Sequence, residues 1–574
     1  MQEASYKIYN ASAGSGKTYV LSKEYIKTIL SSTHSFKQIL AITFTNKAVN
    51  EMKQRIVQSL FEFSKTKSKN EASAMFLDIM KELNIDATSL QEKSKKVLKN
   101  ILHNYAFFDI STIDKFTHRL IRTFAKDLKL PQNFEVVLDT SLLLDEAVSS
   151  LINKAGTNKK LTKVLLDFAI EKIDDDKSWD IAIDLNKIGK LLFNENQAKH
   201  LETLKSKSLD DFLKLKKDLL QEISKIEDGV KDVAKNTLLL IEELGFEFSD
   251  FPRATLPNHF KKITEGLFEP SKLYNNKLEQ NLMDNEIVKK TISKPTEELS
   301  KQLLECYIAI KKLLYSRAFY KNAYKNLVPL TVLNAIQQEV KNIQKEKDQL
   351  SISEFNTIIS NEIKNQPAPF IYERLGEKYR HYFVDEFQDT SEMQWNNLTP
   401  LMSNALESED LSGKTGSLFL VGDAKQAIYR WRGGKAEQFL NLANNKTNPF
   451  VIPPNINNLP NNYRSYEEII QFNNSFFTTT SPFLNNVSYK DLFIQGNKQG
   501  SSTKKGGLVS LTFLEEENSE DENYCEKVLD TIHSVKKDGY TYNDICIITR
   551  KKKHGVLIAN FLMQHKIPIV SSES

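Results

Sequence analysis

The sequence predicts an α/β protein with a parallel sheet at its core and a large helical insertion. Short apolar runs at residues 6–9, 39–43, 382–384 and 418–421 are separated by helical patterns. This alternation is typical of a parallel sheet that helices cover on both faces. Residues 125–330 instead show helical spacing with few strand signals. The chain has 574 residues, and single cores stop growing near roughly 250–300 residues, so we expect more than one domain.

The composition narrows the class of protein. Hydrophobic residues make up 40% of the chain and charged residues 26%, as in ordinary globular proteins. The net charge is only +4, so a surface for nucleic acid must be a local patch. Cys306, Cys525 and Cys546 are too few and too far apart to indicate a disulfide framework or a zinc site. The N-terminus lacks a signal-peptide core and no run approaches the length of a membrane span, so we expect a cytoplasmic protein without a membrane partner.

The first apolar run leads into a loop that is suited to bind phosphate. ASAGSGKT, residues 11–18, follows a predicted strand and precedes a helical pattern. Glycines let backbone N–H groups turn toward phosphates, Lys17 can reach the β- and γ-phosphates, and the Thr18 hydroxyl can hold Mg²⁺. The alternative is a glycine-rich turn without a ligand. The predicted phosphate-binding residues are Ala11, Ser12, Ala13, Gly14, Ser15, Gly16, Lys17 and Thr18.

Two adjacent carboxylates follow the run at residues 382–384. Asp385 and Glu386 lie in FVDEFQDTS, residues 383–391. A strand that ends in Asp-Glu can present one carboxylate to Mg²⁺ and the other to a water molecule. Such a pair is more often solvated surface, and the phosphate loop upstream is what favours the catalytic interpretation.

Aromatic and polar residues follow two other predicted strands. Phe44, Thr45 and Asn46 come after residues 39–43, and GDAKQAIYRWRGG comes after residues 418–421. In the second loop, Gln426 is placed to sense a group at the strand tip. Tyr429, Trp431 and Arg432 combine stacking surfaces with cations, as single-stranded nucleic acid requires. The alternatives are that Phe44 is a core residue and that Trp431 is packed for stability.

The rest of the chain divides into an insertion and a second α/β region. Residues 125–330 predict a helical insertion domain, with a coiled coil as the alternative. Residues 1–124 and 331–450 would form the first domain, and residues 451–574 the first part of another. Residues 445–462 are rich in Asn and Pro and predict a linker. The later part predicts strands at residues 508–514 and 544–549 and a helix at residues 556–564.

Six ordered motifs resemble those of superfamily 1 DNA helicases of the UvrD/Rep group. They are ASAGSGKT, AITFTNKAVNEMKQRI, STIDKF, YFVDEFQDTS, VGDAKQAIYRWRGG and NYRS. Within that group, ASAGSGKT and DTSEMQWNNLTPL are most similar to RecB- and AddA-like helicase–nucleases. The resemblance implies a RecA-like core, an all-α insertion domain and an incomplete second RecA-like domain, because the family's motifs V and VI have no counterpart here.

The resemblance also implies a role for each matching residue. Lys17 and Thr18 would bind phosphate and Mg²⁺, Asp385 would complete the metal site, and Glu386 would polarise water. Gln426 would report the γ-phosphate, Arg464 would act as an arginine finger, and Tyr463 would stack on adenine. The residues expected to grip single-stranded DNA are Phe44, Thr45, Asn46, Tyr429, Trp431 and Arg432.

Two functions follow as expectations. The first is the N-terminal, ATP-binding part of a helicase that uses ATP and Mg²⁺ to move on single-stranded DNA and at junctions with duplex DNA. A partner subunit or nuclease domain would accompany it in repair or recombination. The second is a nucleotide- and DNA-binding module with little turnover. The family's second arginine finger belongs to motif VI, which has no counterpart here, and a missing arginine finger can cost about 10³–10⁵ in rate. We therefore expect weak ATP hydrolysis from these 574 residues alone.

Overall fold

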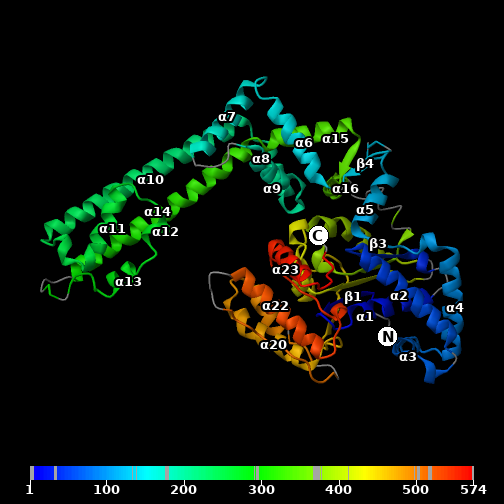
Figure 1. The fold of residues 1–574 in the computed structure, drawn as a ribbon. Helices are drawn as coiled ribbons and strands as arrows, with labels where there is room; N and C mark the ends of the chain where they lie inside the picture. The colour runs from blue at the N-terminus through cyan, green and yellow to red at the C-terminus, as the bar shows by residue number, and fades with distance from the viewer. Residues whose placement is uncertain are drawn as a thin grey trace. The chain divides into compact units, whose positions relative to one another are not determined.

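The computed structural model describes most of the chain in two compact units, residues 1–460 and 461–574. The described residues are 5–571, apart from residues 32–34, 67, 129, 132, 138, 175–179, 290, 293–296, 366–374, 376–377, 411–412, 497, 501–503 and 515–519. The first unit contains the sheet and the helical insertion (Figure 1). Among the described residues, no helix is long and apolar enough to cross a membrane.

A sheet of six parallel strands forms the centre of the first unit, in the order β3-β2-β6-β7-β1-β8. Its strands are β1 (Tyr6–Ala11), β2 (Ile39–Thr43), β3 (Ile110–Thr112), β6 (His381–Val384), β7 (Ser417–Gly422) and β8 (Asn455–Leu459). The four strands predicted from apolar runs are confirmed. Because all strands run parallel, the loops that follow β2, β6, β7 and β1 leave the same edge of the sheet in that order.

Alternation along β1 shows how both faces of the sheet are covered. Tyr9 joins the core cluster that contains residues of the first four helices. Tyr6 points to the other face, where its ring meets Phe450 at a centroid distance of 5.2 Å. Side chains of successive strand residues point to opposite faces, so a strand buried on both sides reads as a continuous apolar run. The helices of this core are α1 (Lys17–Ser31), α2 (Asn46–Lys65), α3 (Ala74–Leu83), α4 (Ala87–His103), α5 (Ile113–Thr123), α16 (Ile352–Asn365), α18 (Glu392–Glu407) and α19 (Ala436–Ala443).

The insertion is helical, as the spacing predicts. It starts and ends at a small parallel sheet of β4 (Glu135–Val137) and β5 (Gln349–Ser351). The long helices α10 (Leu209–Glu243) and α14 (Glu297–Thr331) lie side by side (Figure 1). They share a buried core with shorter helices, including Phe251, Phe260 and Tyr307, so this region is more than a two-stranded coiled coil. The remaining helices are α6 (Thr140–Asn153), α7 (Lys159–Asp174), α8 (Ala182–Gly189), α9 (Ala198–Lys205), α11 (Thr255–Thr264), α12 (Pro270–Leu273), α13 (Leu278–Met283) and α15 (Leu333–Glu346).

The segment predicted as a linker contains a strand. β8 lies within residues 445–462 and pairs in parallel with β1, Ile456 opposite Ile8. Its sequence, NINNL, has only two apolar residues, and its residues are partly or fully exposed. The linker prediction was wrong here because an edge strand needs backbone pairing on one side only, which its side chains do not reveal.

In the second unit the error is the reverse, because strands were predicted that do not form. Its helices are α20 (Glu467–Thr480), α21 (Val487–Gln495), α22 (Glu520–Lys537) and α23 (Lys552–Gln564), and the last confirms the helix predicted at residues 556–564. The strands predicted at residues 508–514 and 544–549 do not form. Both segments are apolar but have no hydrogen-bonded ladder among the described residues, and a strand requires a partner.

Candidate functional site

The loop after β1 has the backbone shape that phosphate binding requires. β1 ends at the buried Ala11 and α1 begins at Lys17. Gly14 and Gly16 have φ of 74° and 89°, a region that glycine adopts without steric cost. The Ser15 hydroxyl donates to the Ser12 carbonyl at 2.8 Å and closes the turn. Ala13 is exposed in the loop, and Thr18 follows Lys17 in the first turn of α1.

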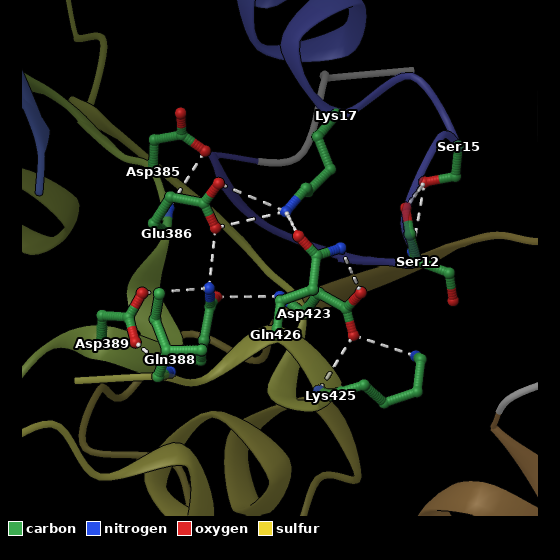
Figure 2. A network of polar contacts seen from close by, with 11 residues as sticks. Ser12, Ser15, Lys17, Asp385, Glu386, Gln388, Asp389, Asp423, Lys425 and Gln426 are labelled. Carbon is green, nitrogen blue, oxygen red and sulfur yellow. Dashed lines mark hydrogen bonds and ion pairs between the residues drawn. The ribbon is translucent and has the colours of Figure 1, made fainter. Parts of the chain in front are cut away.

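Lys17 meets residues that follow β7 and β6, the next two strands on one side of β1 in the sheet. Its Nζ lies 3.2 Å from Glu386 Oε2, after β6, and 3.5 Å from Gln426 Oε1, after β7 (Figure 2). Glu386 has φ of 51°, which is uncommon for a residue with a Cβ. Backbone strain of this kind persists where the surroundings fix it, often at functional sites. The structure thus brings together three predicted catalytic residues that are far apart in the sequence.

Two buried residues that sequence analysis missed connect these groups. Gln388 donates through Nε2 to Glu386 at 2.7 Å, and its Oε1 accepts the backbone N–H of Asp423 at 2.9 Å. Asp423 in turn accepts from Gln426 Nε2 at 2.7 Å and forms an ion pair with Lys425 at 3.0 Å (Figure 2). Both side chains are almost fully buried. The available signal was their position in loops that follow buried strands: Asp423 directly follows β7, and Gln388 lies a few residues after β6. Loops at this edge of a parallel sheet carry ligand contacts.

The carboxylates after β6 have an environment that suits a cation. Burial raises the pKa of Asp385 to about 6, and the neighbouring Glu386 carboxylate adds to this increase. Lys17 and the backbone N–H of Glu386 act in the opposite direction. A buried carboxylate with a raised pKa would be stabilised by a nearby cation.

The donor set fits Mg²⁺ bound together with a nucleotide. Among the described residues, no group of three or more His, Cys, Asp or Glu side chains could hold a metal by itself. Mg²⁺ sites commonly use one or two protein ligands with phosphate oxygens and water. Asp385 and the Thr18 hydroxyl are the predicted ligands, and they follow two different strands at one edge of the sheet.

The predicted DNA-contact aromatics form a continuous group beside this site. The rings of Phe44 and Tyr429 have centroids 4.3 Å apart, and those of Tyr429 and Trp431 are 6.3 Å apart. Trp431 is 67% exposed, so it is not packed in the core. The Arg432 guanidinium lies over the Trp431 ring at 4.9 Å. Phe44 and Tyr429 are partly exposed, so the group combines accessible rings with a cation, as stacking of bases and contact with phosphates require.

The loops that carry the aromatics are fixed by local hydrogen bonds. The Thr45 side chain accepts the N–H of Ala48 and caps α2, and both Thr45 and Asn46 are exposed. Asp389 Oδ1 accepts the backbone N–H groups of Ile428 at 3.2 Å and Tyr429 at 3.4 Å. Burial raises the pKa of Asp389 to about 6, while these two N–H groups lower it. Asp389 therefore joins the carboxylate segment directly to the aromatic loop.

Tyr463 and Arg464 belong to the second unit. Tyr463 is 63% exposed and Arg464 is also exposed. The Asn462 side chain accepts the backbone N–H groups of Arg464 at 2.9 Å and Ser465 at 3.0 Å, which forms a tight turn before α20. The turn presents both predicted nucleotide-contact residues to solvent.

Protein-family models match both units of the chain. Residues 4–447 match the UvrD/REP helicase N-terminal domain, and residues 457–574 match the UvrD-like helicase C-terminal domain. The motif residues described above after β1, β2, β6 and β7 lie within the first match.

Several curated proteins are similar over most of the chain. The RecBCD enzyme subunit RecB of Chlamydia muridarum is 26% identical over 89% of this chain and 46% of its own length. An ATP-dependent helicase/nuclease subunit of Clostridium novyi is 25% identical over 92% of this chain and 43% of its own length. The protein of the same description from Lactococcus lactis subsp. cremoris is 24% identical over 99% and 48%, respectively. The chain spans less than half the length of these relatives.

Proposed function

Because this chain belongs to the UvrD/REP helicase family, we propose that it is the ATP-binding part of a DNA helicase that moves along single-stranded DNA. The observation that carries the proposal is the approach of Lys17 to both Glu386 and Gln426 at the end of a phosphate-binding loop. These residues come from three neighbouring strands, β1, β6 and β7. The process served would be DNA repair or recombination.

ATP hydrolysis would begin with an exchange of partners at Lys17. In the structure its ammonium group is paired with the Glu386 carboxylate at 3.2 Å. Phosphates in the loop would attract Lys17 and leave Glu386 to orient water for attack on the γ-phosphate. Thr18 and Asp385 would hold Mg²⁺, which neutralises phosphate charge when bound. Gln426 would then report whether the γ-phosphate is present.

The second unit would complete the nucleotide site. Arg464 would stabilise the negative charge of the transition state, and Tyr463 would stack on the adenine. Their exposure at the turn held by Asn462 supports this proposal, because both side chains are accessible to a ligand.

Single-stranded DNA would bind along the aromatic group. Phe44, Tyr429 and Trp431 would stack on bases, while Thr45, Asn46 and Arg432 would contact the backbone. The hydrogen bonds from Ile428 and Tyr429 to Asp389 would link this grip to the nucleotide site. Closure and reopening around ATP would move the grip along the strand and into junctions with duplex DNA.

Larger assemblies are part of the same proposal. The similar proteins are described as a subunit of the RecBCD enzyme and as a helicase/nuclease subunit. We infer that this chain acts with a partner subunit or with a nuclease domain.

A second candidate is a nucleotide- and DNA-binding module with little turnover. It is favoured by the contacts of Glu386, whose carboxylate is engaged by Lys17 and by Gln388 at 2.7 Å. If both contacts persisted when nucleotide binds, the Glu386 carboxylate would not be available to orient water. The 574 residues alone would then bind ATP and DNA but hydrolyse ATP slowly.

Steady-state ATP hydrolysis, with and without single-stranded DNA, separates these candidates when it is combined with binding of a fluorescent ATP analogue. Turnover that DNA stimulates supports the motor, and binding without turnover supports the module. Lys17→Ala should abolish nucleotide binding and any turnover. Lys96→Ala changes an exposed lysine on α4 and should have no effect. Normal ATP binding by Lys17→Ala would contradict both candidates.

A further inference from the structure

Glu195 belongs to the helical insertion, and its carboxylate contacts residues of the core next to the loops that follow the sheet strands. It begins a short helical turn, Glu195–Gln197, just before α9. The Ser391 hydroxyl donates to one of its oxygens, and Asn356 Nδ2 donates to the other at 2.7 Å. Ser391 and Asn356 are both buried. Glu195 therefore joins the insertion to two elements of the core, α18 and α16.

Ser391 connects this contact to both ligand loops. It caps α18 at the end of FVDEFQDTS, and its backbone pairs with Gly434 at the end of the aromatic loop. The junction is tight at Gly433, where φ is 98° and an added Cβ would lie 3.2 Å from Ser391 Cβ and 3.5 Å from Glu195 Cβ. A displacement of either loop would thus reach the Glu195 side chain.

A short continuous path leads from Ser391 to the nucleotide site. The same loop contains Glu386, which contacts Lys17. Between Glu386 and Ser391, Asp389 accepts the N–H of Tyr429, and the Thr390 carbonyl accepts the N–H of Lys435 at 3.2 Å. These bonds connect the segment directly to the aromatic loop, and contiguous hydrogen-bond networks of this kind can carry coupling between two sites.

The environment of Glu195 favours a contact that can be broken and remade. Burial raises the pKa of Glu195, the bonds from Ser391 and Asn356 lower it, and the nearby Asp114 raises it. The donors to Glu195 are the uncharged side chains of Ser391 and Asn356. Glu195 is only partly buried, and these two hydrogen bonds hold its carboxylate in place. Glu195 and Ser391 also line a cavity of about 700 Å³, which leaves room for rearrangement.

We propose that Glu195 is a positioning residue that couples the helical insertion and the DNA grip to the nucleotide site through Ser391 and Asn356. This inference rests on the proposed function, since it presupposes that both ATP and single-stranded DNA bind. Glu195 touches neither ligand. It links the junction of the two loops to the insertion, so that binding at one site changes affinity at the other.

The test measures the affinity of a non-hydrolysable ATP analogue with and without a saturating thymidine oligonucleotide. In the unaltered protein, DNA should change the affinity for the analogue by about fivefold or more, a usual size for coupling between sites. Glu195→Ala should reduce this ratio to near one and leave the affinity without DNA unchanged. Glu195→Gln still accepts from Asn356 and can donate to the Ser391 oxygen, so it should retain most of the coupling.

The controls separate coupling from simple loss of structure. Glu242→Ala removes an exposed glutamate from α10 and should keep the full ratio. Thermal melting identifies a variant that fails to fold. If Glu195→Ala does so, Glu195→Asp takes its place, because the shorter side chain cannot reach both donors and should also lose coupling.

Two results would overturn the inference. One is an unchanged affinity ratio in folded Glu195→Ala or Glu195→Asp. The other is equal loss of coupling in Glu242→Ala. Failure of the unaltered protein to bind either ligand would instead refute the proposed function, so the two failures are distinguishable.

Discussion

The two units of this chain contain the same kind of apolar segment in different environments. In residues 1–460, Phe383 on β6 is fully buried and stacks on Phe419 at a centroid distance of 4.5 Å. In residues 461–574, Phe513 and Ile548 lie in comparable apolar segments, and each is 90% exposed. The difference is the presence of hydrogen-bonded neighbours on the sheet. An apolar run permits a strand, but pairing and covering helices are what bury it.

The residues proposed to act on nucleotide differ between the two units in a similar way. Lys17, Glu386 and Gln426 are joined by side-chain contacts across three strands. Arg464 and Tyr463 are exposed on a turn that is fixed through its backbone. The first unit thus fixes its proposed catalytic side chains by side-chain contacts, whereas the second presents its own to solvent.

The largest expected effect is on the rate of ATP hydrolysis. It tests whether the exposed Arg464 of the second unit contributes to hydrolysis together with the residues of the first unit. Arg464→Ala should slow ATP hydrolysis by about 10³, because an arginine finger acts on transition-state charge. Affinity for ATP itself should change little. Single-turnover hydrolysis with excess protein gives the rate, and Arg550→Ala is a matched exposed arginine in the same unit. An unchanged rate for Arg464→Ala would remove the proposed role.

The next largest effect is on the free energy of unfolding, and it compares the buried Phe383 with the exposed Phe513. Phe383→Ala should lower the free energy of unfolding by about 3–5 kcal/mol, because it leaves a cavity in a packed core. Phe513→Ala should change it by less than about 0.5 kcal/mol. Urea denaturation followed by circular dichroism measures both. Equal losses for the two variants would contradict the exposure of Phe513.

A smaller effect is expected on how stability depends on pH. It compares Asp389 with Asp544, whose pKa values are shifted in opposite directions. The folded-state pKa of Asp389 is about 6, above its ordinary value of 3.8, so the folded protein binds the extra proton between these values. Its contribution to stability therefore falls as pH rises through this window. Between pH 4 and 7, the free energy of unfolding of Asp389→Asn should rise by roughly 1–3 kcal/mol relative to that of the unaltered protein. Urea denaturation at several pH values checks the slope.

Asp544 in the second unit provides the opposite case. Hydrogen bonds from the Thr541 hydroxyl and backbone N–H hold the pKa of Asp544 below its ordinary value. Its stabilisation is present above the ordinary pKa and is lost as pH falls through the lowered one. Asp544→Asn should therefore lose stability relative to the unaltered protein as pH rises. If the stability of both variants, relative to the unaltered protein, changed in the same direction with pH, the environments of Asp389 and Asp544 would not differ as described.

The smallest effect concerns ion pairs. The exposed Lys505 pairs with the partly buried Glu467 at 2.8 Å in the second unit, whereas Lys7 and Glu24 form a buried pair at 3.1 Å in the first. Lys505→Ala should lower stability by less than about 1 kcal/mol, and added salt should reduce this loss further. Denaturation at low and high salt measures it. A loss that salt does not change would show that the Lys505 contact is not solvent-exposed.

The sequence was sufficient where local pattern and chemistry agree. The strand β1, the glycines of ASAGSGKT and the helix from Lys17 were predicted because one short segment contains all the necessary signals. The family resemblance inferred from the motifs is confirmed by the matches over residues 4–447 and 457–574. The predicted fold class, with a parallel sheet and a helical insertion, is confirmed as well.

Only the tertiary structure determined the features that depend on contacts between distant parts of the chain. β8 could not be predicted because its strand character comes from pairing with β1. The predicted strands at residues 508–514 and 544–549 were wrong because their apolar pattern has no such pairing. Gln388, Asp423 and Glu195 were missed because their importance lies in contacts with residues distant in sequence. A sequence specifies which groups are available, whereas hydrogen bonds and burial across the chain determine which of them act together.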